Sequence, residues 1–355
     1  MMRSREKRLL RSRLVWVCLP LLWLSGCYLV KQGKEQLELR YGQIPIAEAL
    51  EQEANPQYRV LFKEISRIKA FAENELLLKK SDNYTGYYET SQPGVTFVVT
   101  VSPKNELKAY TWWFPIVGSV PYKGYFNEDD ARELESEFQD RGYDTWVFAA
   151  PAYSTLGWFK DPITTPMLRK GLFYLTSTII HEMTHVTLFV PGEEAFNEQL
   201  ASFIGQKGAL HYFKETLHLT PEQLNTLEAK IKKAKIFSGT VRSYLPHFRE
   251  LYKRQQPLGV TLQQREVLFT ELKAQIGHLY PHLSESDLRF NNARLLQYQR
   301  YTADSPLLNK MWQDSGNDWG RFWELVKIYV GNIQLEQKSQ SQIVTRVVEN
   351  KSDWE

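Results

Sequence analysis

Cysteine is scarce in this sequence, which has only Cys18 and Cys27 among its 355 residues. A disulfide framework is therefore not expected, and cysteine-based metal sites are excluded once the leading segment is removed. The sequence also lacks low-complexity runs, repeats of about 20–50 residues and long linkers rich in Pro, Gly or Ser. These absences favour a globular chain whose chemistry rests on histidine and carboxylate side chains.

The first 26 residues are typical of a signal peptide. After a basic head, the apolar run Leu14–Leu24 is too short to span a bilayer as a stable helix. The run ends in Leu24-Ser25-Gly26-Cys27, which resembles the lipobox of bacterial lipoproteins. The resemblance implies cleavage before Cys27 and lipid on its thiol; the alternative is an uncleaved anchor. Tyr28 stands where Asp would favour the inner membrane, so we expect an outer-membrane lipoprotein facing the periplasm.

The formal net charge of +3 gives no evidence for a nucleic-acid partner. Residues 1–26 carry six basic groups and Glu6, a net of +5, so residues 27–355 are near −2. The basic excess lies in the segment expected to be removed. Apolar residues make up 43% of the chain, enough for a core. We predict one domain over residues 27–335 and a flexible tail over 336–355.

One motif carries chemistry: His181-Glu182-Met183-Thr184-His185 is an H-E-x-x-H sequence. On a helix, residues four apart share a face, so both imidazoles can bind one metal ion. Glu182 can then take a proton from water beside that ion. Uncharged residues surround the motif, as expected for a helix packed in a core.

The third ligand follows from the geometry of a helical hairpin. Pro191 and Gly192 are expected to end the first helix, and a second helical pattern follows them. His185 and Glu198 are equally far from this bend, so Glu198 should face the histidines. The predicted site is one Zn²⁺ per chain held by His181, His185 and Glu198, with a fourth position open, the catalytic arrangement of zinc.

The remaining pattern predicts an α+β fold, mainly helical, with a small mixed or antiparallel β-sheet beside the motif helix. Residues 28–80 are expected to be helical, 94–160 rich in strands, and 166–335 helical. Residues 94–102 and 107–114 are expected to pair as a hairpin. A helix is also expected to begin at Ser284.

Two segments are candidates for substrate contacts. Residues 152–157, with Tyr153, Ser154 and Thr155, are a candidate strand edge for an extended peptide. On the expected helix after Ser284, Asn291, Arg294, Tyr298 and Tyr301 share a polar face. Tyr298 or Tyr301 is a candidate donor to the oxyanion, and Asn292 or Arg294 a candidate contact to substrate or to the groups around zinc. Structural packing remains the alternative for each.

Several motifs together resemble a family of bacterial aminopeptidase lipoproteins. They are the lipobox, residues 153–159 (YSTLGWF), HEMTH, Phe196-Asn197-Glu198 and Asn291-Asn292-Ala293. The metal motif is similar to that of the gluzincins, which implies a zincin-like fold, His181, His185 and Glu198 as zinc ligands and Glu182 as general base. Two departures stand out: the gap from His185 to Glu198 is short, and Ser202 stands where thermolysin-like enzymes have an acid.

The sequence therefore predicts a zinc peptidase, most simply an aminopeptidase, acting on peptides at the envelope. Glu193 and Glu194 are available to hold a substrate ammonium, although an exposed turn explains them equally well. An endopeptidase or another amide hydrolase of the same fold is an alternative. A second alternative is a non-catalytic envelope lipoprotein.

Overall fold

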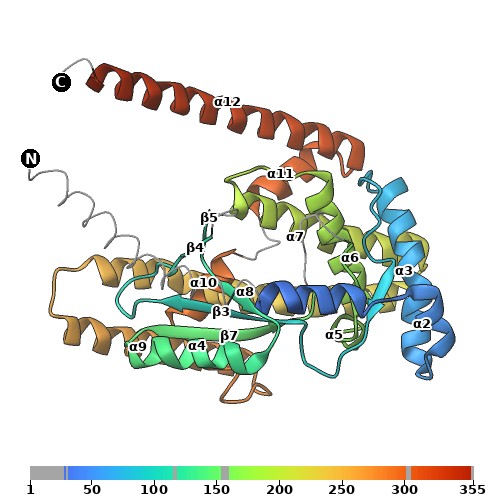
Figure 1. Cartoon of the computed structure of the whole chain (residues 1–355), viewed down its shortest axis with the longest axis horizontal. Helices are drawn as coiled ribbons and strands as arrows, with labels where there is room; N and C mark the ends of the chain where they lie inside the picture. Colours follow the sequence, from blue (N-terminus) through green and yellow to red (C-terminus); the bar gives the residue numbers. More distant parts are fainter. Residues whose placement is uncertain (1–27, 29–30, 115–117, 153–159, 301–304, 353–355) are drawn as a thin grey trace, which may run out of the picture.

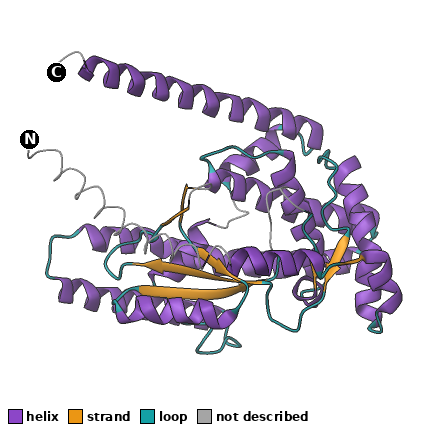
Figure 2. Ribbon diagram, in the orientation of Figure 1, coloured by secondary structure: helices purple, strands orange, loops and turns teal. Residues whose placement is uncertain are grey.

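The computed structural model describes residue 28 and residues 31–114, 118–152, 160–300 and 305–352; the side chains of residue 300 and of residues after 335 lie outside the description. The fold is α+β, mainly helical, as predicted (Figures 1 and 2). Residues 31–41 are helical. The labelled α-helices that follow are α2 (Ile46–Gln52), α3 (Pro56–Asn74), α4 (Glu128–Asp140), α5 (Thr165–Arg169), α6 (Leu172–Thr187), α7 (Glu194–His211), α8 (Pro221–Lys253), α9 (Leu258–Leu279), α10 (Asn292–Arg300), α11 (Pro306–Asp314) and α12 (Trp319–Ser352). One π-helical turn, Tyr212–Thr216, continues α7.

Three small sheets accompany the helices. Their strands are β1 (Ile44–Pro45), β2 (Gly86–Tyr88), β3 (Thr96–Ser102), β4 (Trp112–Phe114), β5 (Gly118–Val120), β6 (Lys123–Tyr125), β7 (Asp144–Ala150) and β8 (Ile163–Thr164). The sheet orders are β1-β2-β8, β6-β3-β7 and β4-β5. Among the described strands, β2 and β8 pair in parallel and the other pairs are antiparallel.

The expected hairpin between residues 94–102 and 107–114 is wrong. β3 pairs with β6 and β7, and only one backbone hydrogen bond, from Tyr110 N to Val101 O, ties the predicted partner segment to it. Both faces of β3 are buried: Val99 and Val101 pack towards α4, and Thr100 and Ser102 lie on the opposite side, where the Thr100 hydroxyl reaches Ala293 O of α10. The short segment between residues 102 and 107 favours a hairpin, but the burial of β3 within the sheet outweighs this local preference.

A local capping signal marks the start of α8: Thr220 and Gln223 form a capping box, with Pro221 in the first turn. The helix expected from Ser284 is wrong: residues 285–288 form a turn, residues 289–291 are irregular, and α10 begins at Asn292. There Ser284 and Asp287 hydrogen bond to each other, so these capping residues close a turn instead of starting a helix.

The largest core cluster joins α3, α6, α7 and α12. A second cluster lies between α8, α9 and α10, and a third between α4 and the β6-β3-β7 sheet. α12 continues as a helix to Ser352, away from the rest of the molecule (Figure 1); flexibility of residues 336–355 stays a prediction. Within the described ranges, every helix is too short or too polar to cross a membrane.

Candidate metal and catalytic site

The site is built on a helical hairpin, α6 followed by α7. α6 ends at Thr187, four residues before the predicted stop at Pro191, and Leu188 is already extended. Gly192 has a φ of +81°, a left-handed conformation that favours glycine. The bend that brings Glu198 opposite the motif therefore spans residues 188–193, a longer turn than the sequence predicts.

Asn197 locks this turn and was missed by sequence reasoning. Its Oδ1 accepts a hydrogen bond from Val190 N at 2.9 Å, and its Nδ2 donates to Val190 O at 2.8 Å. The side chain is 2% exposed. Because Asn197 directly precedes Glu198, this clamp fixes the direction in which α7 presents the carboxylate.

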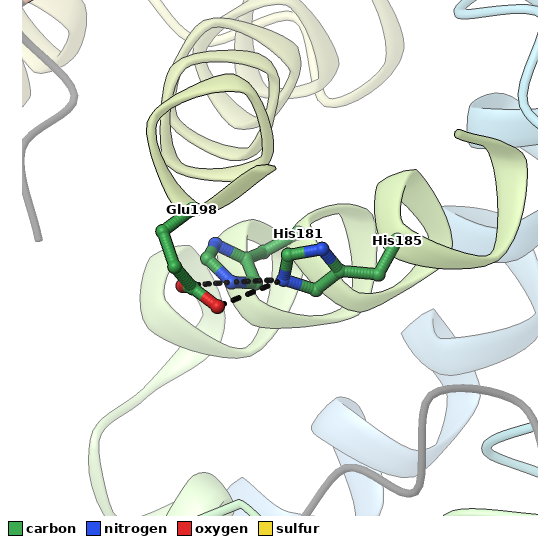
Figure 3. Close-up of side chains that lie close together, drawn as sticks. All are labelled: His181, His185 and Glu198. Atoms are coloured by element: carbon green, nitrogen blue, oxygen red, sulfur yellow. Dashed lines mark hydrogen bonds and ion pairs between the residues drawn. The ribbon is translucent and has the colours of Figure 1, made fainter. Parts of the chain in front are cut away.

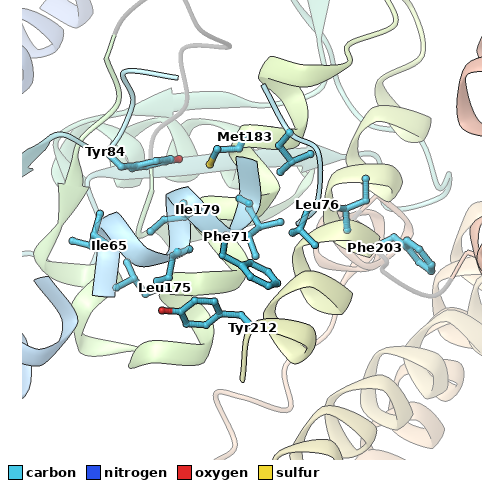
Figure 4. Close-up of a cluster of buried hydrophobic side chains, with 14 of the residues drawn as sticks. Ile65, Phe71, Leu76, Tyr84, Leu175, Ile179, Met183, Phe203 and Tyr212 are labelled. Atoms are coloured by element: carbon cyan, nitrogen blue, oxygen red, sulfur yellow. The ribbon is translucent and has the colours of Figure 1, made fainter. Parts of the chain in front are cut away.

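The two helices approach closely at Gly205. A Cβ placed there would lie 2.7 Å from the carbonyl oxygen of Ser177 and 3.3 Å from Cβ of His181. Apolar side chains fill the space beneath the helices, with Leu175, Ile179 and Met183 of α6 close to Phe71 and Leu76 (Figure 4). Close backbone packing over a filled core holds the ligand-bearing faces together.

His181, His185 and Glu198 converge as predicted (Figure 3). The two Nε2 atoms are 3.1 Å apart. Glu198 Oε2 lies 3.5 Å from His181 Nε2, and Oε1 lies 3.5 Å from His185 Nε2. The two nitrogen–oxygen distances of 3.5 Å are longer than the usual 2.7–3.2 Å of an N–H···O hydrogen bond. Ligands about 2.1 Å from a tetrahedral ion lie roughly 3.4 Å apart, so the triangle matches one face of a zinc site.

The electrostatics of the histidines suit metal binding. Burial lowers the pKa of His185, and the neighbouring His181 lowers it further, so this imidazole is neutral as a ligand must be. Burial also lowers the pKa of His181, but the hydrogen bond with Glu198 and the charge of Glu182 outweigh it and the pKa is raised. A proton or a cation between His181 and Glu198 is therefore favoured.

Two polar atoms near the triad are buried with no hydrogen-bond partner among the residues that the structure describes: Oε2 of Glu182 and Nδ1 of His185. An unsatisfied buried polar group costs about 1–3 kcal/mol. For Glu182, that cost favours a protic group beside the triad, which is where a general base meets water. For His185, ligating histidines normally donate this N–H to an acceptor. Within the described chain none accepts it, in line with the departure at Ser202.

Two tyrosines, the buried Tyr84 and the half-buried Tyr174, lie in the electrostatic field of Glu182. Burial raises the pKa of Tyr84 well above its ordinary value, and the charge of Glu182 adds to the effect. Burial raises the pKa of Tyr174 too, with a smaller contribution from Glu182. Both phenols therefore stay protonated beside the carboxylate. Tyr84 also has a φ of 62°, rare for a bulky residue. No sequence pattern near the motif points to it.

The other predicted residues are placed as follows. Asn292 is fully buried and hydrogen bonds through its side chain to Tyr252, Pro103 and Glu106. The guanidinium of Arg294 lies 4.5 Å from the ring centres of Trp146 and Phe290 and donates to backbone oxygens.

These contacts give Asn292 and Arg294 packing roles; substrate contact by either stays a prediction. The ring of Tyr298 is 5.9 Å from that of Phe237 in the second core cluster. Cys27, Tyr301 and the stretch containing Tyr153, Ser154 and Thr155 lie outside the described residues.

The fold and site define a class: an α+β protein in which an H-E-x-x-H helix and the next helix place two imidazoles and a carboxylate around one point. The chain belongs to the family described as "Putative aminopeptidase", whose model matches residues 27–341. That membership supports a peptidase. Comparison with curated proteins and with solved structures gives no match.

Proposed function

We propose that this protein is a zinc-dependent peptidase, an aminopeptidase by its family, anchored by lipid on Cys27 to the outer membrane and facing the periplasm. One observation carries the zinc proposal: the 3.1, 3.5 and 3.5 Å edges of the His181, His185 and Glu198 triangle. Neutral imidazole and carboxylate donors suit Zn²⁺, and a set of three protein ligands leaves room for water or substrate.

The residues of the site have distinct roles in peptide hydrolysis. A zinc ion held by His181, His185 and Glu198 would supply Lewis-acid chemistry, lowering the pKa of water to about 7 and polarising the peptide carbonyl. Glu182, whose Oε2 is buried and unpartnered, takes the proton from the attacking water. The same carboxyl group then delivers this proton to the departing nitrogen, and the second proton of the water follows it, so that an ammonium group and a carboxylate leave the site.

Negative charge on the carbonyl oxygen needs a donor besides the metal. Tyr298 and Tyr301 remain the candidates for this role. Replacing each by Phe removes only the phenol oxygen. An unchanged kcat in both variants would eliminate them as donors.

The general-base assignment is tested by Glu182→Gln. This change keeps the shape of the side chain and removes its basicity, so kcat for peptide hydrolysis should fall by about 10²–10⁴. Metal content, measured by atomic emission on the purified protein, should stay at one zinc per chain. Glu228→Gln, the same change on an exposed part of α8, should leave both values unaltered. Wild-type activity retained in Glu182→Gln would exclude the mechanism.

The aminopeptidase and endopeptidase alternatives differ in their need for a free amine. Matched peptides with a free and an acetylated N-terminus separate them: hydrolysis confined to the free form identifies an aminopeptidase. Glu193 and Glu194 are the available acids for the ammonium group, on the turn before α7 and in its first helical position. A metal-loaded protein that cleaves no member of a diverse peptide library would favour the non-catalytic alternative.

A further inference from the structure

Tyr28, the residue after Cys27, is fixed on the surface of the molecule. Its hydroxyl donates a hydrogen bond to Gly124 O at 2.8 Å. Its ring centre lies 6.0 Å from that of Phe114 and 5.4 Å from that of Tyr125, and the ammonium group of Lys123 is 4.0 Å from it. The start of the mature chain is thereby tied to β4 and β6, so a lipid on Cys27 is one peptide bond from this surface.

The β4–β5 pair beside Tyr28 presents an uncharged outer face. Successive residues of a strand point to opposite sides. Trp112 points inward and packs 6.0 Å from Phe138, whereas Trp113 points outward and is 69% exposed. Its partner across the pair, Ser119, is exposed as well, as is Thr111. A large apolar ring with two small hydroxyl neighbours therefore faces away from the core.

We propose that this outer face, defined as Thr111, Trp113 and Ser119, rests in the phospholipid surface to which Cys27 is attached. The inference goes beyond peptidase activity and rests on the proposed lipidation of Cys27. Tryptophan prefers the membrane–water interface, where its ring is shielded and its N–H stays near polar head groups. Trp113 enters that layer without burying a charge.

The lipid tether on Cys27 favours a membrane over a protein as the partner of this outer face. A stable protein interface buries about 800 Å² on each side, and one exposed Trp between two hydroxyl residues is far smaller. A surface held beside the bilayer by a covalent lipid needs no such area, because the anchor supplies a high effective concentration. The fixed position of Tyr28 means that the anchor holds the molecule in one orientation, with β4 and β5 towards the lipid.

Site-specific fluorescence tests the proposal in the lipidated, full-length mature protein. Cys18 is removed with the signal peptide and the thiol of Cys27 is occupied by lipid, so an introduced cysteine is the only free thiol. Trp113→Cys and Ser119→Cys carry the environment-sensitive dye NBD. Val60→Cys is the control, because Val60 is 56% exposed and α3 lies far from β4 along the long axis of the molecule (Figure 1). Each protein is reconstituted into vesicles of phosphatidylethanolamine and phosphatidylglycerol.

We expect blue-shifted emission at positions 113 and 119, quenched by doxyl-labelled phospholipid in the same vesicles, and neither effect at position 60. Emission typical of water at both 113 and 119 overturns the proposal. A blue shift without quenching by labelled lipid also overturns it and indicates a protein partner. Mass spectrometry of the N-terminal peptide separates the two proposals: without lipid on Cys27 both anchoring and this inference fail, whereas loss of peptidase activity alone affects neither.

Discussion

Gly205 lets α6 and α7 approach closely enough for Glu198 to meet the two histidines, and Gly205→Ala tests this. The added methyl group would lie 2.7 Å from Ser177 O, whereas nine in ten real Cβ contacts exceed 3.4 Å. The obstacle is a backbone oxygen inside a helix, so no side-chain rotation relieves the clash. The helices must therefore separate by as much as about 0.7 Å near this point.

The size of the effect follows from opposing contributions. Overpacking destabilises the fold by about 1–3 kcal/mol, whereas replacing Gly by Ala inside a helix stabilises it by about 0.5–1 kcal/mol. The net expectation is a destabilisation of about 0.5–2 kcal/mol. Metal affinity should respond more strongly, because metal sites tolerate only about 0.2 Å in ligand distances. Glu198 is two helical turns from Gly205 on the same face, so we expect zinc affinity to fall about 10–100-fold.

Zinc affinity is measured by competition with a chelating dye, and stability by urea unfolding. Gly208→Ala is the matched control, one turn along the same helix. There the added methyl group meets side-chain atoms of Leu76 and Ile180 instead of a backbone oxygen, so a shift of these side chains relieves the clash without separating the two helix backbones. Gly208→Ala should lose some stability but keep its zinc affinity. Wild-type zinc affinity in Gly205→Ala would show that close helix approach does not position the site.

Three further outcomes are expected. Asn197→Asp keeps the acceptor for Val190 N–H but loses the amide donor and buries a charge, which should cost about 2–3 kcal/mol in urea unfolding and weaken zinc binding. Gly239→Ala, in α8 with open space around the new methyl group, should raise the free energy of unfolding by about 0.5–1 kcal/mol. Zinc at 1,000 times its Kd should add about 4 kcal/mol of stability; EDTA should remove this increment and the activity while far-UV circular dichroism stays unchanged.

The metal triad was predictable because its parts depend on short stretches of chain. His181 and His185 share a helix face by periodicity alone. Glu198 required one more inference, that a Pro-Gly pair marks a bend and that equal distances along the two arms face each other. The position of Glu198 was predicted correctly although the details of the turn were not: α6 stops at Thr187, and the turn is longer than expected. The arms are unequal with this turn, because His185 lies two residues before the end of α6 and Glu198 four residues after the start of α7, yet the side chains still meet.

The pairing of β3 was not predictable from neighbouring residues. Its main partner, β7, lies more than forty residues away, and burial on both faces decides the register. Tyr84 illustrates the same limit at the site. It comes to Glu182 because its backbone N–H donates to Asp161 O at 2.7 Å, a contact between distant segments. Neither Tyr84 nor Asp161 has a sequence pattern that links it to the H-E-x-x-H motif.

The framework of the site is set by burial that needs no metal. Ile179, Ile180 and Met183 on α6 and Leu200 and Ile204 on α7 are all fully buried. Burying such side chains contributes roughly 1.5–3 kcal/mol each, in total about as much as a typical domain's net stability. The hairpin is therefore specified by apolar packing, and the imidazoles and carboxylate are carried to one point on its surface. Binding a cation then requires little reordering, which is what a site that exchanges water and substrate at every turnover needs.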